Sequence, residues 1–114
     1  KELDYPPFSR IVLMEFSGTH EPEVQHHAER FASRLNAQNP RNAFRVLGPA
    51  DAAIPKIRDL YRKHILIKDL RAADANGQFL RTALEHVLRE YESSQLGKNK
   101  KVRMVIDVDP QGMM

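Results

Sequence analysis

Four short segments of the chain have the apolar pattern of β-strands. They cover residues 9–16, 43–47, 61–68 and 102–108. In the last segment apolar and polar positions alternate, which predicts one face on a core and one mixed face. Residues 51–59 have no such pattern, and we expect an irregular connection there.

Two further segments have the 3.6-residue apolar period of amphipathic helices. The first begins within residues 19–23, where a proline lies among acidic residues, and ends at Asn39 and Pro40. Its apolar stripe is Val24, Ala28, Phe31 and Leu35. The second begins after Asp74 or Asn76 as its cap. Its stripe is Phe79, Leu80, Ala83, Leu84, Val87, Leu88 and Tyr91.

The order strand, helix, strand, strand, helix, strand predicts an α+β, two-layer βαββαβ sandwich of ferredoxin-like or ribosomal-protein-like type. Its four-stranded antiparallel sheet would carry both helices on one face. The 114 residues fit one domain. We expect residues 1–8 to be a linker, 9–110 the domain and 111–114 a tail. The start at Lys1 indicates an excised domain.

The composition excludes several kinds of site. The chain has no cysteine, so it has no disulfide, thiolate zinc site or cysteine nucleophile. No apolar run exceeds four residues, so we expect no membrane span or secretion signal, and cytoplasmic residence. The adjacent His26 and His27 would point about 100° apart on a helix. No His-x-x-x-His pair is present on a predicted helix, and we expect the histidines at the surface.

Nothing in the sequence predicts catalysis by this chain alone. Asp107 and Asp109 lie two apart on a strand, a spacing that suits a magnesium site or an acid–base pair. No third acid or histidine has a recognisable spacing to them, so we interpret them as solvated acids at a strand end. There is no phosphate loop and no nucleophile elbow.

The net charge of +3 permits a nucleic-acid partner without requiring one. Basic residues are nevertheless grouped in two stretches, as rows of phosphates would require. The predicted DNA contacts are Lys56, Arg58, Arg62, Lys63, Lys68, Lys98, Lys100 and Lys101. The residues leave two hypotheses open: a nucleic-acid- or partner-binding accessory domain, or a stand-alone ferredoxin-like module that is regulatory or binds RNA. An ordinary solvated surface would have the same composition.

Five short motifs occur in register along the chain. They are Tyr5-Pro6-Pro7-Phe8, Val46-Leu47-Gly48-Pro49-Ala50, Ile54-Pro55-Lys56-Ile57, Tyr61-Arg62 and Val105-Ile106-Asp107-Val108-Asp109-Pro110. From about residue 4 to 110, the chain resembles the C-terminal domain of the PriA family of primosomal replication-restart helicases.

The resemblance implies a protein that moves 3′ to 5′ on DNA using ATP and acts at abandoned forks with primosome proteins. ATP, magnesium and zinc would be bound by upstream domains, and no cofactor by this one. The domain would pack against the upstream helicase lobes and help to bind branched and single-stranded DNA. It would also contribute to the site for the acidic tail of single-stranded DNA-binding protein. The family's arginine and glutamine near the second helix match Arg71 and Gln78 here, with Arg81 as a competing match.

Overall fold

The computed structural model describes residues 8–94, 98 and 101–108. Its elements are β1 (Phe8–Gly18), α1 (Glu21–Ala37), β2 (Phe44–Ile57), β3 (Leu60–Leu70), α2 (Gln78–Ser93) and β4 (Val102–Val108). The predicted βαββαβ order and fold class are confirmed. The irregular connection expected over residues 51–59 is only partly correct: the register with β3 is interrupted between Asp51 and Lys56, but β2 continues to Ile57 and pairs again with β3. The proposed linker and tail lie almost wholly outside the described residues.

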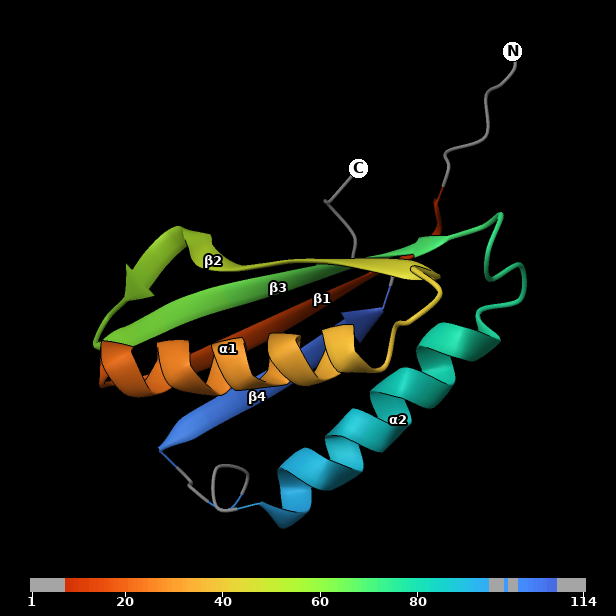
Figure 1. Ribbon diagram of the computed structural model, residues 1–114. Helices are drawn as coiled ribbons and strands as arrows, with labels where there is room; N and C mark the ends of the chain where they lie inside the picture. The colour runs from red at the N-terminus through yellow and green to blue at the C-terminus, as the bar shows by residue number, and fades with distance from the viewer. Residues whose placement is uncertain (1–7, 95–97, 99–100, 109–114) are drawn as a thin grey trace.

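The four strands form one antiparallel sheet in the order β2-β3-β1-β4. Both helices lie against the same face of this sheet, as Figure 1 shows. Alternation along β1 explains the two faces: Val12, Met14 and Phe16 are buried under the helices. Glu15 and its neighbours of the same parity lie on the opposite face, which we call the free face.

An aromatic cluster holds the two helices to the sheet and to each other. The ring of Phe31 in α1 lies 5.9 Å from that of Phe16 in β1 and 5.7 Å from that of Tyr91 in α2. The expectation that all histidines lie at the surface is wrong for His27, which is 1% exposed. His27 lies on the buried stripe of α1, between Val24 and Phe31. A hydrogen bond of 2.7 Å between its Nδ1 and the Tyr91 hydroxyl satisfies its polar edge.

The burial of His27 predicts a loss of stability in mildly acidic solution. Burial lowers the pKa of His27 below its ordinary value of 6.5; the nearby His26 lowers it further, and Glu23 raises it somewhat. The unfolded chain therefore takes up the proton first, and the free energy of unfolding falls as the pH drops below about 6.5. We expect His27→Gln to flatten this part of the profile, measured by urea unfolding from pH 7.5 to 5. An unchanged slope would contradict the assignment.

Candidate nucleic-acid interface

The register of the sheet brings parts of the two basic stretches to one end. Gly18, the last residue of β1, pairs with Tyr61 of β3 on one side and with Val102 of β4 on the other. A Cβ atom added to Gly18 would lie 2.7 Å from the carbonyl oxygen of Lys101, so glycine permits this close approach. We call this region the Gly18 end of the sheet; its basic residues are Lys56, Arg58, Lys101 and Arg103.

Arg62 and Arg103 both stand opposite Ser17, one on each neighbouring strand. Two strand spacings of about 4.8 Å place their Cα atoms about 10 Å apart on the free face. Arg103 is exposed. The side chain of Arg62 instead forms hydrogen bonds within the fold.

The guanidinium of Arg62 makes three hydrogen bonds. Its Nη2 and Nε donate to Oε1 of Glu15 at 2.7 and 3.2 Å, and its Nη1 donates to the carbonyl oxygen of Ile54 at 2.7 Å. His64 Nε2 also hydrogen-bonds to that Glu15 oxygen, at 2.9 Å. Burial raises the pKa of Glu15, but hydrogen bonds and charge from Arg62 and His64 outweigh it and hold this pKa below its ordinary value. Glu15 is therefore an ionised anchor for Arg62.

Lys63 faces the helix side of the sheet and is 8% exposed. Its ammonium group forms ion pairs with Asp51 of β2 at 2.5 Å and Glu21 of α1 at 3.0 Å. The hydrogen bond that Lys63 donates to Asp51 raises the pKa of Lys63; burial opposes this, and Glu21 adds to it. Lys63 thus ties the start of α1 to β2.

The remaining predicted contacts are more scattered. Lys68 is half-buried at the opposite end of the sheet, where it pairs with Ile11 and Arg45. Lys98 is exposed in the segment between α2 and β4. Lys100 lies outside the described residues. Sequence periodicity cannot separate these cases, because only the strand register and the ion-pair partners distinguish a solvated lysine from a structural one.

The start of α2 is built around a buried carboxylate. Asp74 is 3% exposed, and its two oxygens accept hydrogen bonds from the backbone N–H groups of Phe79 and Leu80, both at 3.0 Å. The side-chain oxygen of Asn76 accepts a hydrogen bond from the backbone N–H of Gln78 at 3.3 Å. The N-cap position itself is Gly77, and the predicted capping residues Asp74 and Asn76 accept first-turn N–H groups from positions before it. Gly77 has φ = 75°, and an added Cβ would lie 2.3 Å from the Arg10 guanidinium.

A pocket of about 300 Å³ lies beside this helix start, lined by Gln78, Phe79, Thr82 and residues 73–76. The ring of Phe79 is 42% exposed, which corrects its predicted place in the buried stripe. The buried residues of α2 are Leu80, Ala83 and Val87. Leu80 follows Phe79 directly and points about 100° away from it around the helix. The guanidinium of Arg41, which the sequence analysis did not single out, lies 5.1 Å from the centre of the Phe79 ring.

The three predicted tail-binding residues are all exposed, but they do not share this pocket. Gln78 lines it, whereas Arg71 and Arg81 do not. Gln78 and Arg81 are three apart and neighbours on the helix surface, but Phe79 lies on the other flank of Gln78. The only signal for Arg41 in the sequence was a cation directly after the helix-ending Pro40.

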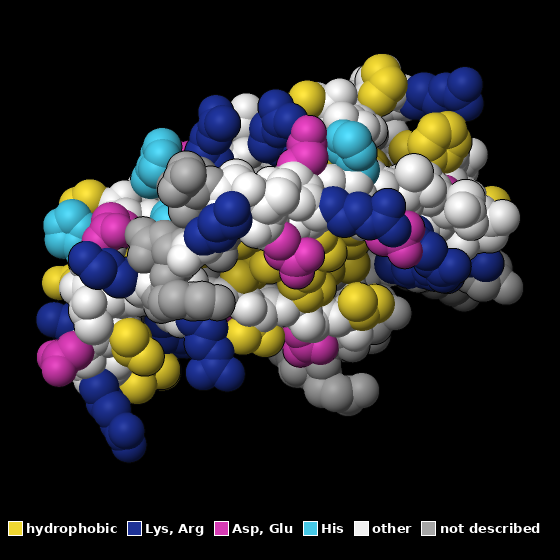
Figure 2. Space-filling model, turned by 90° about the horizontal axis from the view of Figure 1, so that it is seen from below, with side chains coloured by type: hydrophobic (Ala, Val, Ile, Leu, Met, Phe, Trp, Pro, Cys, Tyr) yellow, Lys and Arg dark blue, Asp and Glu magenta, His cyan; other side chains and the backbone are white. Residues whose placement is uncertain are grey.

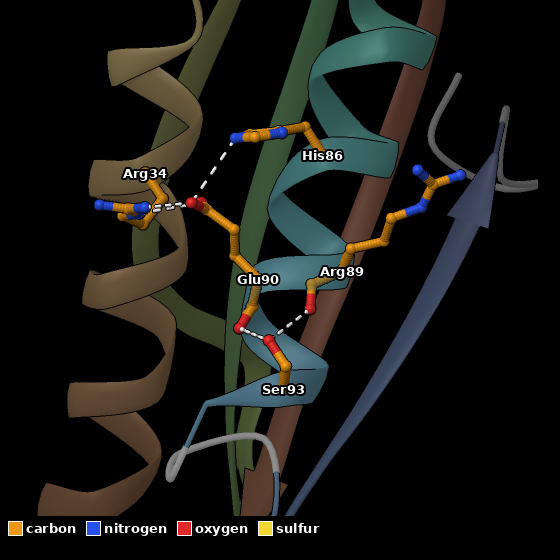
Figure 3. Close-up of polar contacts among 5 residues, drawn as sticks. All are labelled: Arg34, His86, Arg89, Glu90 and Ser93. Carbon is orange, nitrogen blue, oxygen red and sulfur yellow. Dashed lines mark hydrogen bonds and ion pairs between the residues drawn. The ribbon is translucent and has the colours of Figure 1, made fainter.

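Polar contacts join the two helices farther along α2 (Figure 3). We call them the polar clamp; its members are Arg34, His86 and Glu90. Glu90 accepts hydrogen bonds from Arg34 of α1, and His86 Nε2 lies 3.5 Å from the same carboxylate. The hydrogen bond from Arg34 lowers the pKa of Glu90, while burial slightly opposes it. The side chain of Arg89 points away from Glu90, and the hydroxyl of Ser93 donates to the carbonyl oxygens of Arg89 and Glu90.

The clamp borders a second pocket of about 280 Å³, with a floor of Phe31, Val87 and Tyr91. Figure 2, which views the molecule from below, shows hydrophobic side chains gathered in the middle of this face with basic and acidic side chains around them. Arg34 and Glu90, which line this pocket, are hydrogen-bonded to each other between the helices, and we interpret the pocket as part of helix packing.

Within residues 8–94, 98 and 101–108, no three His, Cys, Asp or Glu side chains are grouped so as to hold a metal ion. Asp107 is exposed, and its predicted companion Asp109 lies outside this part of the chain. The helices that the structure describes include none with the length and apolar character to cross a membrane.

Comparison with known proteins adds an independent observation. The sequence profile of the family described as "Primosomal protein N C-terminal domain" matches residues 1–111. The chain is 28% identical over 111 residues to the Replication restart protein PriA of Haemophilus influenzae, covering 97% of this chain and 14% of that protein. It is 31% identical over 114 residues to the protein of the same name from Bacillus subtilis, covering 100% of this chain and 13% of that protein.

Proposed function

The chain belongs to the family of primosomal protein N C-terminal domains, and on that premise we propose that it is a DNA-binding accessory domain of a replication-restart helicase. The helicase activity, with its ATP, magnesium and zinc, belongs to domains outside this chain. The domain packs against those upstream helicase lobes and works with primosome proteins. Its own contribution is to hold branched and single-stranded DNA.

The observation that carries this proposal is the convergence of basic residues at the Gly18 end of the sheet. Two stretches that are far apart in sequence meet there because β3 and β4 begin on either side of the end of β1. Positive charges held on a rigid sheet suit phosphates, which bind without regard to base sequence. The proposed phosphate contacts are Lys56, Arg58, Lys98, Lys101 and Arg103.

The other predicted contacts enter this proposal differently. Arg62 and Lys63 act as scaffolding through their ion pairs with Glu15, Asp51 and Glu21. Lys68 lies at the end of the sheet opposite the Gly18 end. It would contact DNA only if the DNA ran along the whole free face. Lys100 keeps its predicted role as a contact next to Lys101.

A salt titration of DNA binding tests the proposal. Three to five phosphate contacts give a slope of about −3 to −4 in a plot of log affinity against log salt. We expect this slope on forked and on linear duplexes of unrelated sequence. Affinity that does not change with salt, or a strong preference for one duplex sequence, would contradict phosphate binding.

We also propose that the start of α2 holds part of the acidic tail of single-stranded DNA-binding protein. That tail ends in an apolar residue with a terminal carboxylate, so it needs a cation, an amide and an apolar surface side by side. Gln78 and Phe79 supply the amide and the apolar surface at one pocket, and Arg41, whose guanidinium lies 5.1 Å from the centre of the Phe79 ring, supplies a cation beside it. This favours Arg41 as the carboxylate-binding cation, with Arg71 and Arg81 as outer contacts for the acidic residues.

Substitutions at this pocket are expected to weaken tail-peptide binding unequally. Arg41→Gln removes the cation nearest to the apolar surface, and we expect about a tenfold loss of affinity; Arg71→Gln and Arg81→Gln should each cost about two- to threefold. Fluorescence titration of the labelled peptide into the natural protein that carries this chain measures the losses. Arg30→Gln, in the middle of α1, is the control. Equal losses at all four arginines would show a general charge effect and contradict the site.

A further inference from the structure

β2 leaves the sheet and returns to it just before the β2–β3 turn. Between the pairs Asp51–Lys63 and Lys56–Tyr61, β2 advances five residues while β3 advances two. The extra residues form an arch, which we define as residues 52–55. Figure 1 shows β2 rising from its partner strand at this point, on the side away from the helices, before it rejoins β3.

The arch is held in place by hydrogen bonds from the free face of the sheet. Arg62 donates to the carbonyl oxygen of Ile54 at 2.7 Å, and Glu15 holds Arg62 in place at 2.7 Å. His64 adds a further hydrogen bond to Glu15. An arch with this support keeps its shape in solution, because its carbonyl is bound to a guanidinium that is itself fixed by an ionised carboxylate.

This braced segment presents large apolar side chains to solvent. Ile54 is 58% exposed, and the cross-strand pair Ile57 and Leu60 is 43% and 45% exposed. Leu60 lies two residues before Arg62 on β3, so the pair projects from the free face on the same side as the arch. Three aliphatic side chains held rigidly in water at one place indicate a contact surface.

Positive charge surrounds this apolar tip. The ammonium group of Lys56 lies 4.8 Å from the centre of the Tyr61 ring, on the other side of the ribbon. Arg58 forms the turn with φ = 57°, and the exposed Arg103 stands two strands away. An apolar surface bordered by cations complements a base stack bordered by phosphates. A two-stranded ribbon also has the width of a DNA groove.

We propose that the arch and the hairpin tip press Ile54, Ile57 and Leu60 against the base stack at the branch point of forked DNA and unstack its last base pairs. Aliphatic side chains on β-ribbons and arms act in this way as wedges when cations hold the flanking phosphates. The inference rests on the proposed DNA binding and adds to it an element that distinguishes a branch from a continuous duplex. A protein partner for the same tip is the competing outcome.

The test uses the natural protein that carries this chain and forked DNA with 2-aminopurine at the branch point. Wild-type protein should raise the 2-aminopurine fluorescence and bind the fork more tightly than a linear duplex. The triple variant Ile54→Ser, Ile57→Ser, Leu60→Ser should lose the fluorescence rise and about tenfold in fork affinity, while its affinity for linear duplex and its salt slope stay unchanged. Leu47→Ser with Val105→Ser, at equally exposed apolar positions elsewhere on the sheet, is the matched control.

A second variant removes the brace and keeps the apolar side chains. Arg62→Lys retains the charge but loses the three-way hydrogen bonding, and it should reduce the fluorescence rise in the same way. An unchanged rise in the triple variant overturns the inference while the DNA-binding proposal stands. The triple variant could instead be cleaved more readily by a protease while it binds the fork as before. That result would assign the tip to a protein contact and would also overturn the inference. No binding of any DNA by wild-type protein overturns the proposed function itself.

Discussion

Replacement of Lys56, Arg58 and Arg103 by glutamine is expected to weaken DNA binding by about 500-fold at about 0.1 M salt. Each phosphate contact contributes about 0.9 to the salt slope, which corresponds to about an eightfold loss of affinity per contact at that salt concentration. The slope itself should become less negative by about two to three. Fluorescence anisotropy of a labelled fork at several salt concentrations measures both quantities.

The matched control changes the same amount of charge at other places. Arg30, Arg45 and Arg89 are exposed arginines on α1, on the far end of β2 and on α2. Their joint replacement by glutamine alters the net charge as much as the first variant, so it reproduces any nonspecific effect of charge. If both triple variants lose the same affinity and slope, binding depends on total charge and not on the Gly18 end of the sheet.

The fold was predictable because its signals are local. Alternation of apolar positions, the 3.6-residue period and the capping residues Asp74 and Asn76 each lie within one element, and the order of elements leaves few topologies. The error at residues 51–59 has a physical reason as well. Ile54, Pro55 and Ile57 do not alternate, because the arch there removes the two-residue period from a strand that is still paired at both ends.

The site was less predictable because it depends on register. Arg62 and Lys63 are as basic as Lys56 and Arg58, yet they point to opposite faces of β3 and each finds a carboxylate from a distant element. Arg103 is not among the contacts predicted from the sequence, because only its position opposite Ser17 brings it to the β2–β3 hairpin end. The sequence alone predicts a surface position for His27, because its partner, the Tyr91 hydroxyl, comes from sixty-four residues away.

The second large effect is expected at Asp74. Asp74→Ala should lower the free energy of unfolding by about 2–4 kcal/mol, because it removes the acceptor for two backbone N–H groups at once. The N–H of Leu80 is the costlier loss, since that residue is 2% exposed and water cannot replace the carboxylate there. Urea unfolding at pH 7 measures the change. Asn76→Ala, which removes the exposed acceptor of Gln78, is the control and should cost less than about 0.5 kcal/mol.

The pH dependence of the same site separates a carboxylate cap from simple packing. Burial raises the pKa of Asp74, but the backbone N–H groups of Phe79 and Leu80, a hydrogen bond with Asp69 and the charge of Arg10 outweigh it, so the pKa lies below its ordinary value of 3.8. The stabilisation is therefore complete above about pH 3.8 and is lost as the pH falls through the lowered pKa. Asp74→Asn keeps the shape and cannot titrate, so the stability difference between it and the wild type should shrink below pH 3.8. A difference that stays constant down to pH 2 would mean that the charge of Asp74 contributes nothing to holding the start of α2.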